Sequence, residues 1–304
     1  MELFVRIVRA GTLAGAARDL SRSPASVTAR LKALERHYGV TLLTRTTRTS
    51  VLTDAGRDFF DACVAILAEV EEAGTRLRGH ADFFRGPLRI TAPSDIGQQH
   101  VAPVLSRFIA SHPDVTPYLH LSDGVQGVVA EGFDMAIRYG ELANSSLQAQ
   151  RLARTRRIVC ASPEYLARAG TPKHPADLKE HACISMMWAN EIGARWHFSN
   201  GTNPENVRFQ PARTTNDGAL ARRWAIEGVG IVLKARLDVL EELRQGRLVT
   251  LLETYTVDYQ RPRKNGVLDL HVLHSGRKRR LPQRVAAFVE ALKEHFQTIM
   301  MRAD

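Results

Sequence analysis

"SPASVTARLKALE" (23–35) predicts a helix with two different faces. Ser23 suits the N-cap, and Pro24 suits the first helical position, where its missing N–H costs nothing. One stripe at helical spacing is apolar and is predicted to face a core; it consists of Val27, Leu31, Leu34 and Tyr38. The opposite face starts with small side chains and becomes basic; it consists of Ala25, Ala29, Lys32 and Arg36.

Such a face is typical of a recognition helix, which enters the major groove of DNA by its N-terminal end. Small side chains permit a close approach, the Thr28 side chain can contact a base edge, and a helix N-terminus favours phosphate. Between Arg18 and Arg48 there are seven Lys or Arg residues against Asp19 and Glu35. Each arginine alone is more simply a solvated surface residue, but together they predict DNA binding.

The neighbouring residues complete a small N-terminal domain, expected over 1–53. Helices are predicted near 3–10 and over 12–20, with Thr12 as an N-cap, and Gly39 ends the quoted helix. Residues 40–53 alternate around a basic turn, as in a hairpin, and Arg45 and Arg48 lie at that turn. A hairpin beside a recognition helix would contact the DNA backbone or minor groove.

Residues 54–84 are predicted to form a long linker helix. Its apolar residues follow a heptad spacing of 4, 3, 4, 3 and 4, which favours pairing with a second copy of the chain. The alternative is a single amphipathic helix that packs on its own domain. The expected dimer interface consists of Phe59, Cys63, Ile66, Val70, Ala73 and Leu77.

Residues 85–304 alternate apolar strands with helical stretches, which indicates an α/β domain with largely parallel sheets. Strands are expected at 88–92, 116–122, 134–140, 156–162, 230–234 and 268–274. The net charge of +10 over 304 residues favours a polyanionic partner, although a merely basic surface is the simpler alternative. Three widely spaced cysteines make a disulfide framework or zinc site unexpected. Without a signal peptide or membrane-spanning run, a cytoplasmic protein is expected.

The passage "AGTLAGAARDLSRSPASVTARLKALERHYGVTLLTRTTRTSVLTDAG" (10–56) resembles the winged helix-turn-helix of LysR-type transcriptional regulators. Further stretches resemble the effector-binding domain of that family, which is folded like a periplasmic binding protein; they are "GPLRITAPSDIGQQHVAP" (86–103), "EGFDMAIRYGEL" (131–142), "RRIVCASPEYLARAGTP" (156–172) and "GVGIVLKARLDVLEELRQGRLV" (228–249). The resemblance implies an α/β multidomain fold, with an N-terminal winged helix-turn-helix, a linker helix and a two-subdomain effector-binding domain. It implies double-stranded DNA and a small-molecule effector as partners, and a homodimer or homotetramer.

Within the helix-turn-helix, the family often has Gln where this chain has Pro24, and Arg or Lys where it has Ala29. We therefore expect Thr28 and Arg30 to contact bases in their place. The residues expected to contact DNA are Ser23, Pro24, Ala25, Ser26, Thr28, Ala29, Arg30, Lys32, Arg36, Arg45 and Arg48.

The resemblance further implies an effector site in the cleft between subdomain I, about 88–161 with 267–300, and subdomain II, about 162–266. Polar side chains and N–H groups converge where strands end and helices begin. The expected effector-binding residues are Ser94, Asp95, Ser122, Asp123, Arg138, Asn216, Asp217 and Lys234. Ser94, Asp95 and Asp217 are alternatively plain helix caps, and Lys234 a surface lysine. If Ser94 and Lys234 face the cleft, an anionic effector such as a small carboxylate follows.

Enzyme motifs are missing. Gly228 and Gly230 form a lone GxG, with no third glycine, and the chain has no Walker loop, GxSxG or HExxH. His271 and His274 are three apart in a predicted strand, so they lie on opposite faces and are unsuited to a metal. We expect no catalysis, cofactor or metal. The rival interpretation is a cytoplasmic α/β solute-binding or catalytic protein whose basic N-terminal helices bind another protein.

Overall fold

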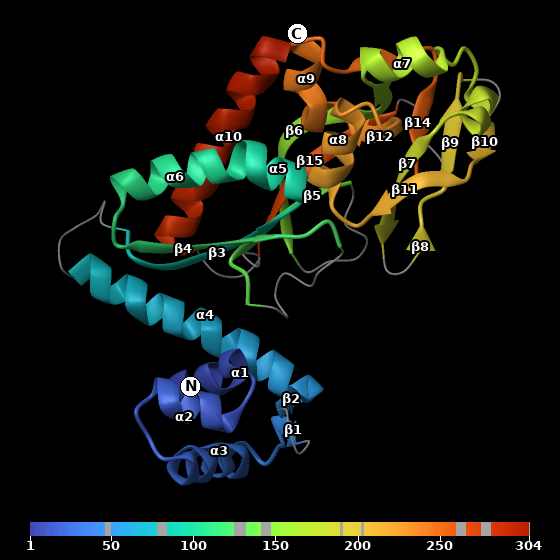
Figure 1. Ribbon diagram of the computed structural model, residues 1–304. Coiled ribbons are helices and arrows are strands. Elements are labelled where there is room, and N and C mark those ends of the chain that lie inside the picture. Colours follow the sequence, from blue (N-terminus) through green and yellow to red (C-terminus); the bar gives the residue numbers. More distant parts are fainter. Residues whose placement is uncertain are drawn as a thin grey trace. The chain divides into compact units, whose positions relative to one another are not determined.

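The computed structural model describes residues 1–45, 50–77, 84–124, 132–140, 147–188, 191–201, 204–259, 266–274 and 281–303. The chain divides into two compact units (Figure 1). The N-terminal unit consists mainly of Met1–Phe84, and the C-terminal unit contains most of the remaining chain.

The N-terminal unit contains the helices and the hairpin predicted from the sequence. They are α1 (Glu2–Ala10), α2 (Leu13–Asp19), α3 (Pro24–Tyr38) and the antiparallel strands β1 (Leu43–Arg45) and β2 (Ser50–Leu52). The Oγ of Ser23 accepts a hydrogen bond from the backbone N–H of Ser26 at 3.2 Å, and Gly39 ends α3 in the left-handed conformation. The hydroxyl of Thr12 caps α2 in the same way. These caps confirm the predicted helix starts.

The core of this unit lies between the inner faces of the three helices and the start of α4 (Asp54–Leu77). The apolar stripe of α3 is correct for Val27 and Leu31, which are buried. It is wrong for Tyr38, which is 47% exposed and whose ring lies 5.0 Å from the ring of Phe59. The aromatic end of α3 therefore lies over the first turns of α4 rather than in the core.

The junction between the hairpin and α4 is tightly fitted. The Thr53 hydroxyl donates to the backbone oxygen of Thr41 at 2.7 Å and accepts the N–H of Gly56 at 2.9 Å. A Cβ atom on Gly56 would lie only 1.9 Å from the backbone oxygen of Leu42. A side chain at position 56 is thus incompatible with this approach of α4 to the strand.

The C-terminal unit has two halves. The first half contains β3 (Gly86–Ala92), β4 (Val115–Leu121), β5 (Met135–Tyr139) and β15 (Val267–His274), with α5 (Ser94–Ile96), α6 (Ala102–Ser111) and α10 (Gln283–Ala303). Strand β3 is parallel to β4 and β5, whereas β15 is antiparallel to β5. A π-helical turn over Gly97–Val101 joins α5 to α6. The helical stretch therefore begins at Ser94, separated from the end of β3 at Ala92 only by Pro93.

The second half contains α7 (Pro163–Ala169), α8 (Gly218–Ile226) and α9 (Leu240–Arg244). Its strands are β7 (Cys183–Trp188), β8 (Glu191–Ile192), β9 (Arg195–Ser199), β10 (Pro204–Arg208), β11 (Pro211–Thr215), β12 (Ile231–Ala235), β13 (Val249–Leu251) and β14 (Thr256–Asp258). Strands β11 and β12 are both parallel to β7. Its core surrounds the buried Trp196 and Phe198.

Strand β6 (Gln148–Ala161) belongs to both halves. Its beginning pairs with β15, for example Arg154 with Asp269, and its end pairs with β12 and β13. All three pairings are antiparallel, so the expectation of largely parallel sheets is wrong for this central region. Strand β6 is therefore a continuous connection between the strands of the first half and those of the second half.

Candidate functional site

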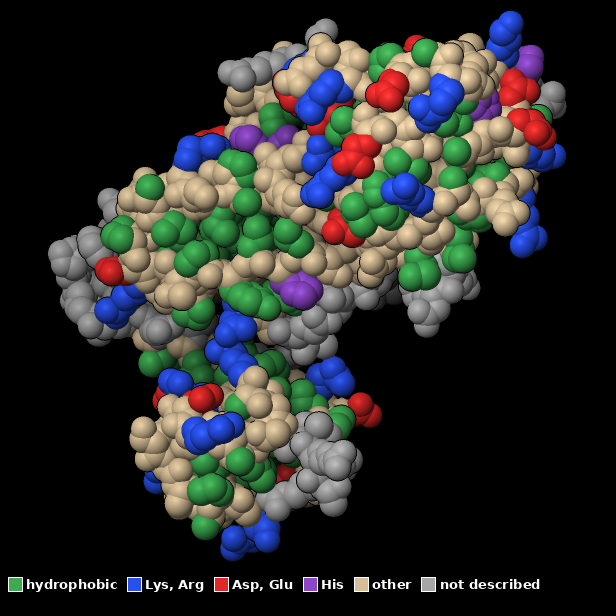
Figure 2. Space-filling model, in the orientation of Figure 1, with side chains coloured by type: hydrophobic (Ala, Val, Ile, Leu, Met, Phe, Trp, Pro, Cys, Tyr) green, Lys and Arg blue, Asp and Glu red, His purple; other side chains and the backbone are tan. Residues whose placement is uncertain are grey.

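The outer face of α3 has the exposure that DNA contact requires. Ser26 and Thr28 are half-buried; the exposed members of the predicted set are Ser23, Pro24, Ala25, Ala29, Arg30, Lys32 and Arg36. Figure 2 shows Lys and Arg side chains projecting from the surface of α3. Arg45 ends strand β1, and Arg48 lies outside the described residues.

Glu35 contributes to this face in a way that the sequence analysis missed. Its Oε1 atom accepts hydrogen bonds from the backbone N–H groups of Leu42 at 2.9 Å and Leu43 at 3.2 Å. The carboxylate therefore ties α3 to the strand that leads into the hairpin. Glu35 therefore holds α3 in position relative to the hairpin, although its charge is opposite to that of the surrounding basic residues.

The predicted dimer seam of α4 divides into two parts. Phe59 and Cys63 pack against the core of their own unit, and Cys63 is completely buried. Cys63 thus has no surface for a partner, which corrects its assignment to the interface. Ile66 is half-buried, whereas Val70 is 65% exposed. Ala73 and Leu77 belong to α4, but their side chains lie outside the described part of the structure.

In the C-terminal unit, predicted effector-binding residues converge on the N-terminus of α8. Asp217 caps this helix, because its Oδ1 accepts the N–H groups of Ala219 at 2.9 Å and Leu220 at 3.1 Å. The N–H of Gly218 is bound by the Oδ2 of Asp123 at 2.9 Å. The first N–H groups of α8 therefore all have partners.

Ser94, at the start of α5, connects these groups. Its hydroxyl accepts a hydrogen bond from the N–H of Ala219 at 3.1 Å and donates to the carboxylate of Asp123. Ser94 and Asp123 come from the first half, whereas α8 belongs to the second. The two halves thus meet directly at this helix end.

Beneath them lies a buried network of charges. The ammonium group of Lys234 contacts the Asp95 carboxylate, lies 3.3 Å from Asp238 and donates to the backbone oxygen of Gly218 at 3.2 Å. Arg222 contacts Asp95 at 2.7 Å and Glu242 at 2.6 Å. The network therefore joins carboxylates of both halves to cations of the second.

Burial and pairing act in opposite directions on these groups. Burial alone lowers the pKa of Lys234, but the carboxylates of Asp238 and Asp95 raise it, with a net rise. The pKa of Asp238 is raised, chiefly by burial, against the opposing effect of Lys234. Burial, and then the neighbouring Asp238 carboxylate, also raise the pKa of Tyr139, whose hydroxyl donates to Asp238 at 2.7 Å. Lys234 is therefore charged but already neutralised by its neighbours.

The structure brings together five of the eight predicted residues; these are Ser94, Asp95, Asp123, Asp217 and Lys234. Asn216 is exposed, and Ser122 accepts the N–H of Gly124 within its own loop at 3.3 Å. Arg138 instead donates to the hydroxyl of Thr91 at 2.9 Å. Lys234 is buried and paired, so its interpretation as a surface lysine is wrong.

Sequence reasoning missed the partners of these residues. Arg222, Asp238, Glu242 and Tyr139 complete the buried network. Lys234 lies near the end of a strand and Asp238 lies in the turn that follows it, so helical periodicity gave no sign of their contact. Arg222 and Glu242 are joined only by the tertiary fold.

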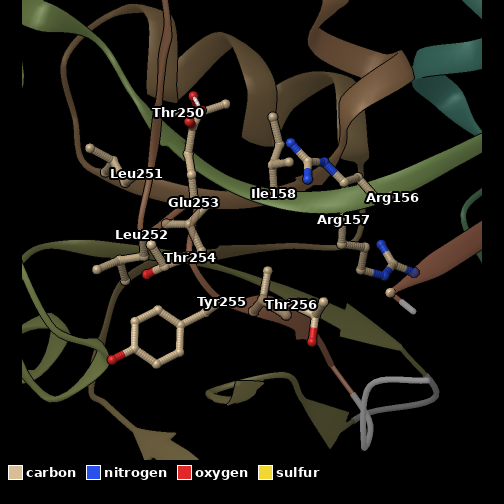
Figure 3. A pocket seen from close by; sticks show the side chains of 13 residues that line it. Arg156, Arg157, Ile158, Thr250, Leu251, Leu252, Glu253, Thr254, Tyr255 and Thr256 are labelled. Atoms are coloured by element: carbon tan, nitrogen blue, oxygen red, sulfur yellow. Dashed lines mark hydrogen bonds between the residues drawn. The ribbon is translucent and has the colours of Figure 1, made fainter. Parts of the chain in front are cut away.

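A small cavity of about 100 Å³ lies elsewhere in the C-terminal unit, between β6 and residues 250–257. Figure 3 shows Arg156, Arg157 and Ile158 on one side of it and residues 250–256 on the other. Arg157 is paired with Asp258 at 2.8 Å. None of the residues predicted to bind an effector lines this cavity.

Within the described residues, no group of three or more His, Cys, Asp or Glu side chains is arranged to hold a metal ion. His271 and His274 have separate partners, the backbone oxygen of Gly140 at 3.0 Å and the amide of Gln150 at 2.9 Å. No helix in the described part of the chain has the length and apolar character needed to cross a membrane.

Comparison with known proteins supplies the family. Residues 1–57 match the family model of the bacterial regulatory helix-turn-helix protein, lysR family, and residues 81–297 match the LysR substrate binding domain. The chain is 32% identical over 255 residues to the HTH-type transcriptional regulator DmlR of Escherichia coli K12, covering 84% of this chain and 83% of DmlR. It is 31% identical over 300 residues to the transcriptional activator AaeR of the same strain, covering 97% and 93%.

A solved structure agrees over the full length. CrgA, a LysR-type transcriptional regulator from Neisseria meningitidis, has a TM-score of 0.60 and 28% identity, with 97% of each chain covered. The two family models together match residues 1–57 and 81–297, which is more than half of the chain. The chain therefore belongs to the LysR family of DNA-binding transcriptional regulators with an effector-binding domain.

Proposed function

We propose that this regulator reads its operator with the outer face of α3. The observation that carries the proposal is the order of exposed side chains along that face, small at Ala25 and Ala29 and basic at Lys32 and Arg36. Small residues at the N-terminal turns let the helix backbone approach the base edges, and the later cations reach phosphates. We assign base contacts to Thr28 and Arg30 and backbone contacts to the hairpin, with Arg45 and Arg48.

We further propose that residues 1–53 act as the DNA-binding domain and that 54–84 pair two copies through Ile66, Val70, Ala73 and Leu77. An exposed valine in the middle of a long helix is the feature that supports a partner there. Paired helices would place two recognition helices on successive half-sites of one DNA face. The members of this family act as oligomers, and either a homodimer or a homotetramer fits this pairing.

For the effector, we propose a small carboxylate bound between subdomain I (about 88–161 and 267–300) and subdomain II (about 162–266). The support is that Lys234, Arg222 and the N-terminus of α8 lie at the junction of the halves and already bind carboxylates there, those of Asp95 and Asp123. Because Lys234 is already paired, a bound carboxylate must compete with Asp95. Calorimetric titration of the full chain with a carboxylate panel tests this; binding of neutral or cationic compounds alone would contradict it.

We also propose that the protein acts without catalysis, cofactor or metal, in the cytoplasm, where its DNA partner lies. The reason is that its relatives are transcriptional regulators. Membership of this family disfavours the rival interpretation as a solute-binding or catalytic protein with a protein-association module.

The test is a footprint of the purified protein on the DNA upstream of its own gene at two salt concentrations. Lys32→Ala should reduce the slope of log K against log salt by about 1 and weaken all sequences alike, whereas Thr28→Val should change the sequence preference. Arg6→Ala is the matched control, because Arg6 is on α1 and pairs with Glu2 at 3.1 Å. If Thr28→Val leaves the preference intact, α3 does not read bases as proposed.

A further inference from the structure

Two carboxylates of the first half of the C-terminal unit, Asp95 and Asp123, bind groups of the second half. We propose that they form a latch that holds the two halves closed on each other, and that release of this latch is the step by which the domain switches. The proposal rests on the proposed function, because it concerns the regulation of the same effector site.

The buried charges show that the latch can open. Within the second half, Lys234 pairs with Asp238, and Arg222 and Arg247 both pair with Glu242. Asp95 is a third carboxylate, which enters from the first half and contacts both cations.

Breaking a buried ion pair is normally costly because it leaves a charge without a partner. Here Lys234 keeps Asp238, and Arg222 keeps Glu242, when Asp95 withdraws. Asp95 itself lies at the junction between the halves, so it gains water as they separate. Each cation that Asp95 contacts thus keeps a carboxylate partner in the open state.

The hydrogen bonds at the N-terminus of α8, which form the rim of the junction between the halves, are also divided between the two halves. Asp217 caps α8 from within the second half and holds the N–H groups of Ala219 and Leu220. Asp123 adds a bond to the N–H of Gly218, and Ser94 adds a second bond to Ala219. When the halves separate, α8 keeps its own cap, and only Gly218 loses its partner.

Gly218 is required for this fit. A Cβ atom there would lie 2.9 Å from the ammonium nitrogen of Lys234 and 3.3 Å from carboxylate oxygens of both Asp95 and Asp123. The latch carboxylates therefore approach the helix more closely than a side chain at position 218 would allow. A glycine at position 218 therefore fits the close contact between α8 and the two latch carboxylates.

The helical stretch that carries Asp95 of the latch has an unusual local structure. Ser94 and Asp95 start it, and its π-helical turn contains Gln99, whose amide donates to the backbone oxygen of Asp238 at 2.8 Å. Single π turns inside α-helices are frequent at functional sites. Three residues of this helical stretch, Ser94, Asp95 and Gln99, thus contact the second half, which allows their contacts to form and break together.

The experiment measures the distance between the halves directly. Spin labels on Ala110→Cys in α6 and Arg223→Cys in α8 of the full chain report it by pulsed electron paramagnetic resonance; both positions are exposed. The natural cysteines are buried and should not take the label. Asp123→Ala and Asp95→Asn should each shift the distance distribution by more than about 2 Å or broaden it.

Asp114→Ala is the matched control, because it removes an exposed carboxylate of the same half that does not belong to the latch. Unchanged distributions in both latch variants, or an equal shift in the control, would falsify the latch. If circular dichroism shows that Asp95→Asn does not fold, Asp123→Ala decides alone, because it removes only a rim contact. The distance measurement uses no DNA. If the natural protein gives no operator footprint, this result contradicts the proposed function but leaves the latch proposal unaffected.

Discussion

The Glu35 carboxylate lies 2.9 Å from the backbone nitrogen of Leu42 and accepts its hydrogen bond. It accepts the neighbouring N–H of Leu43 as well, so one side chain of α3 holds two residues of the strand before the hairpin. Hydrogen bonds to an ionised acceptor are stronger than neutral ones. The orientation of the recognition helix relative to the hairpin therefore depends on this glutamate.

Glu35→Ala should release that strand. The lost charged hydrogen bonds should destabilise the N-terminal unit by about 1–2 kcal/mol, since Glu35 is only half-buried. Hydrogen exchange of the Leu42 and Leu43 amides should accelerate, and operator affinity should fall. Glu2→Ala is the control, because Glu2 pairs only with Arg6 on the exposed surface of α1. Equal exchange rates in Glu35→Ala and the natural protein would exclude this role.

Gly56→Ala should disrupt the same unit for a steric reason. Its Cβ would lie 1.9 Å from the backbone oxygen of Leu42, and backbone cannot move aside as a flexible side chain can. We expect a loss of at least about 1–3 kcal/mol, the usual cost of overpacking. Limited proteolysis should cleave the N-terminal unit while the C-terminal unit stays intact. Ala55→Ser, at an exposed position beside it, should behave like the natural protein.

The sequence predicted the N-terminal unit well because its determinants are local. Caps such as Ser23 and Thr12 act within three residues, and helical periodicity places Val27 and Leu31 in the core. Tyr38 was misplaced because α4, distant in sequence, provides a ring contact at the surface.

The effector site was predictable only in part. Residues that follow strands or begin helices, such as Ser94 and Asp217, were found from their positions. Their partners were not, since Arg222 and Glu242 meet Asp95 only when separate elements pack together. A lysine in sequence has no visible counter-ion, so neither the neutralised charge of Lys234 nor the latch was foreseeable.

Val70→Glu should separate the proposed dimer. A charge at this exposed position of α4 would face its copy in the partner, and like charges buried together repel. Sedimentation should show a smaller particle, and operator affinity should fall because the half-sites are no longer bound jointly. Arg57→Glu is the control, since it is exposed and lies near the opposite face of α4. A Val70→Glu protein of unchanged size would remove Val70 from the interface.

Lys234→Met should destabilise the C-terminal unit in a pH-dependent way. Asp238 would lose its cation in a buried site, at a cost of about 3–5 kcal/mol near pH 8. Its pKa is already raised by burial and should rise further. A carboxyl group with a raised pKa binds its proton more tightly in the folded state, so stability falls as pH rises from the unfolded value, about 3.9, through the folded one.

The defect of Lys234→Met should therefore be smaller at pH 5 than at pH 8. Urea unfolding followed by tryptophan fluorescence measures both values. Lys173→Met, which removes an exposed lysine, should have little effect at either pH. An equal cost at both pH values would mean that Asp238 does not take up a proton.

The three cysteines should be unreactive in the folded chain. All are buried, and burial raises the pKa of Cys160 and of Cys183 to about 12. Thiolates rather than thiols attack disulfide reagents, so Ellman's reagent at pH 8 should modify none of them until urea unfolds the protein.

The folded state holds the protons of the Cys160 and Cys183 thiols more tightly than the unfolded chain, whose thiols titrate near 8.5. Stability should consequently fall as pH rises from about 8.5 toward 12. Ala110→Cys supplies the positive control, with one thiol that reacts at once; equally rapid reaction of the natural protein would show that a buried cysteine becomes accessible in the folded state.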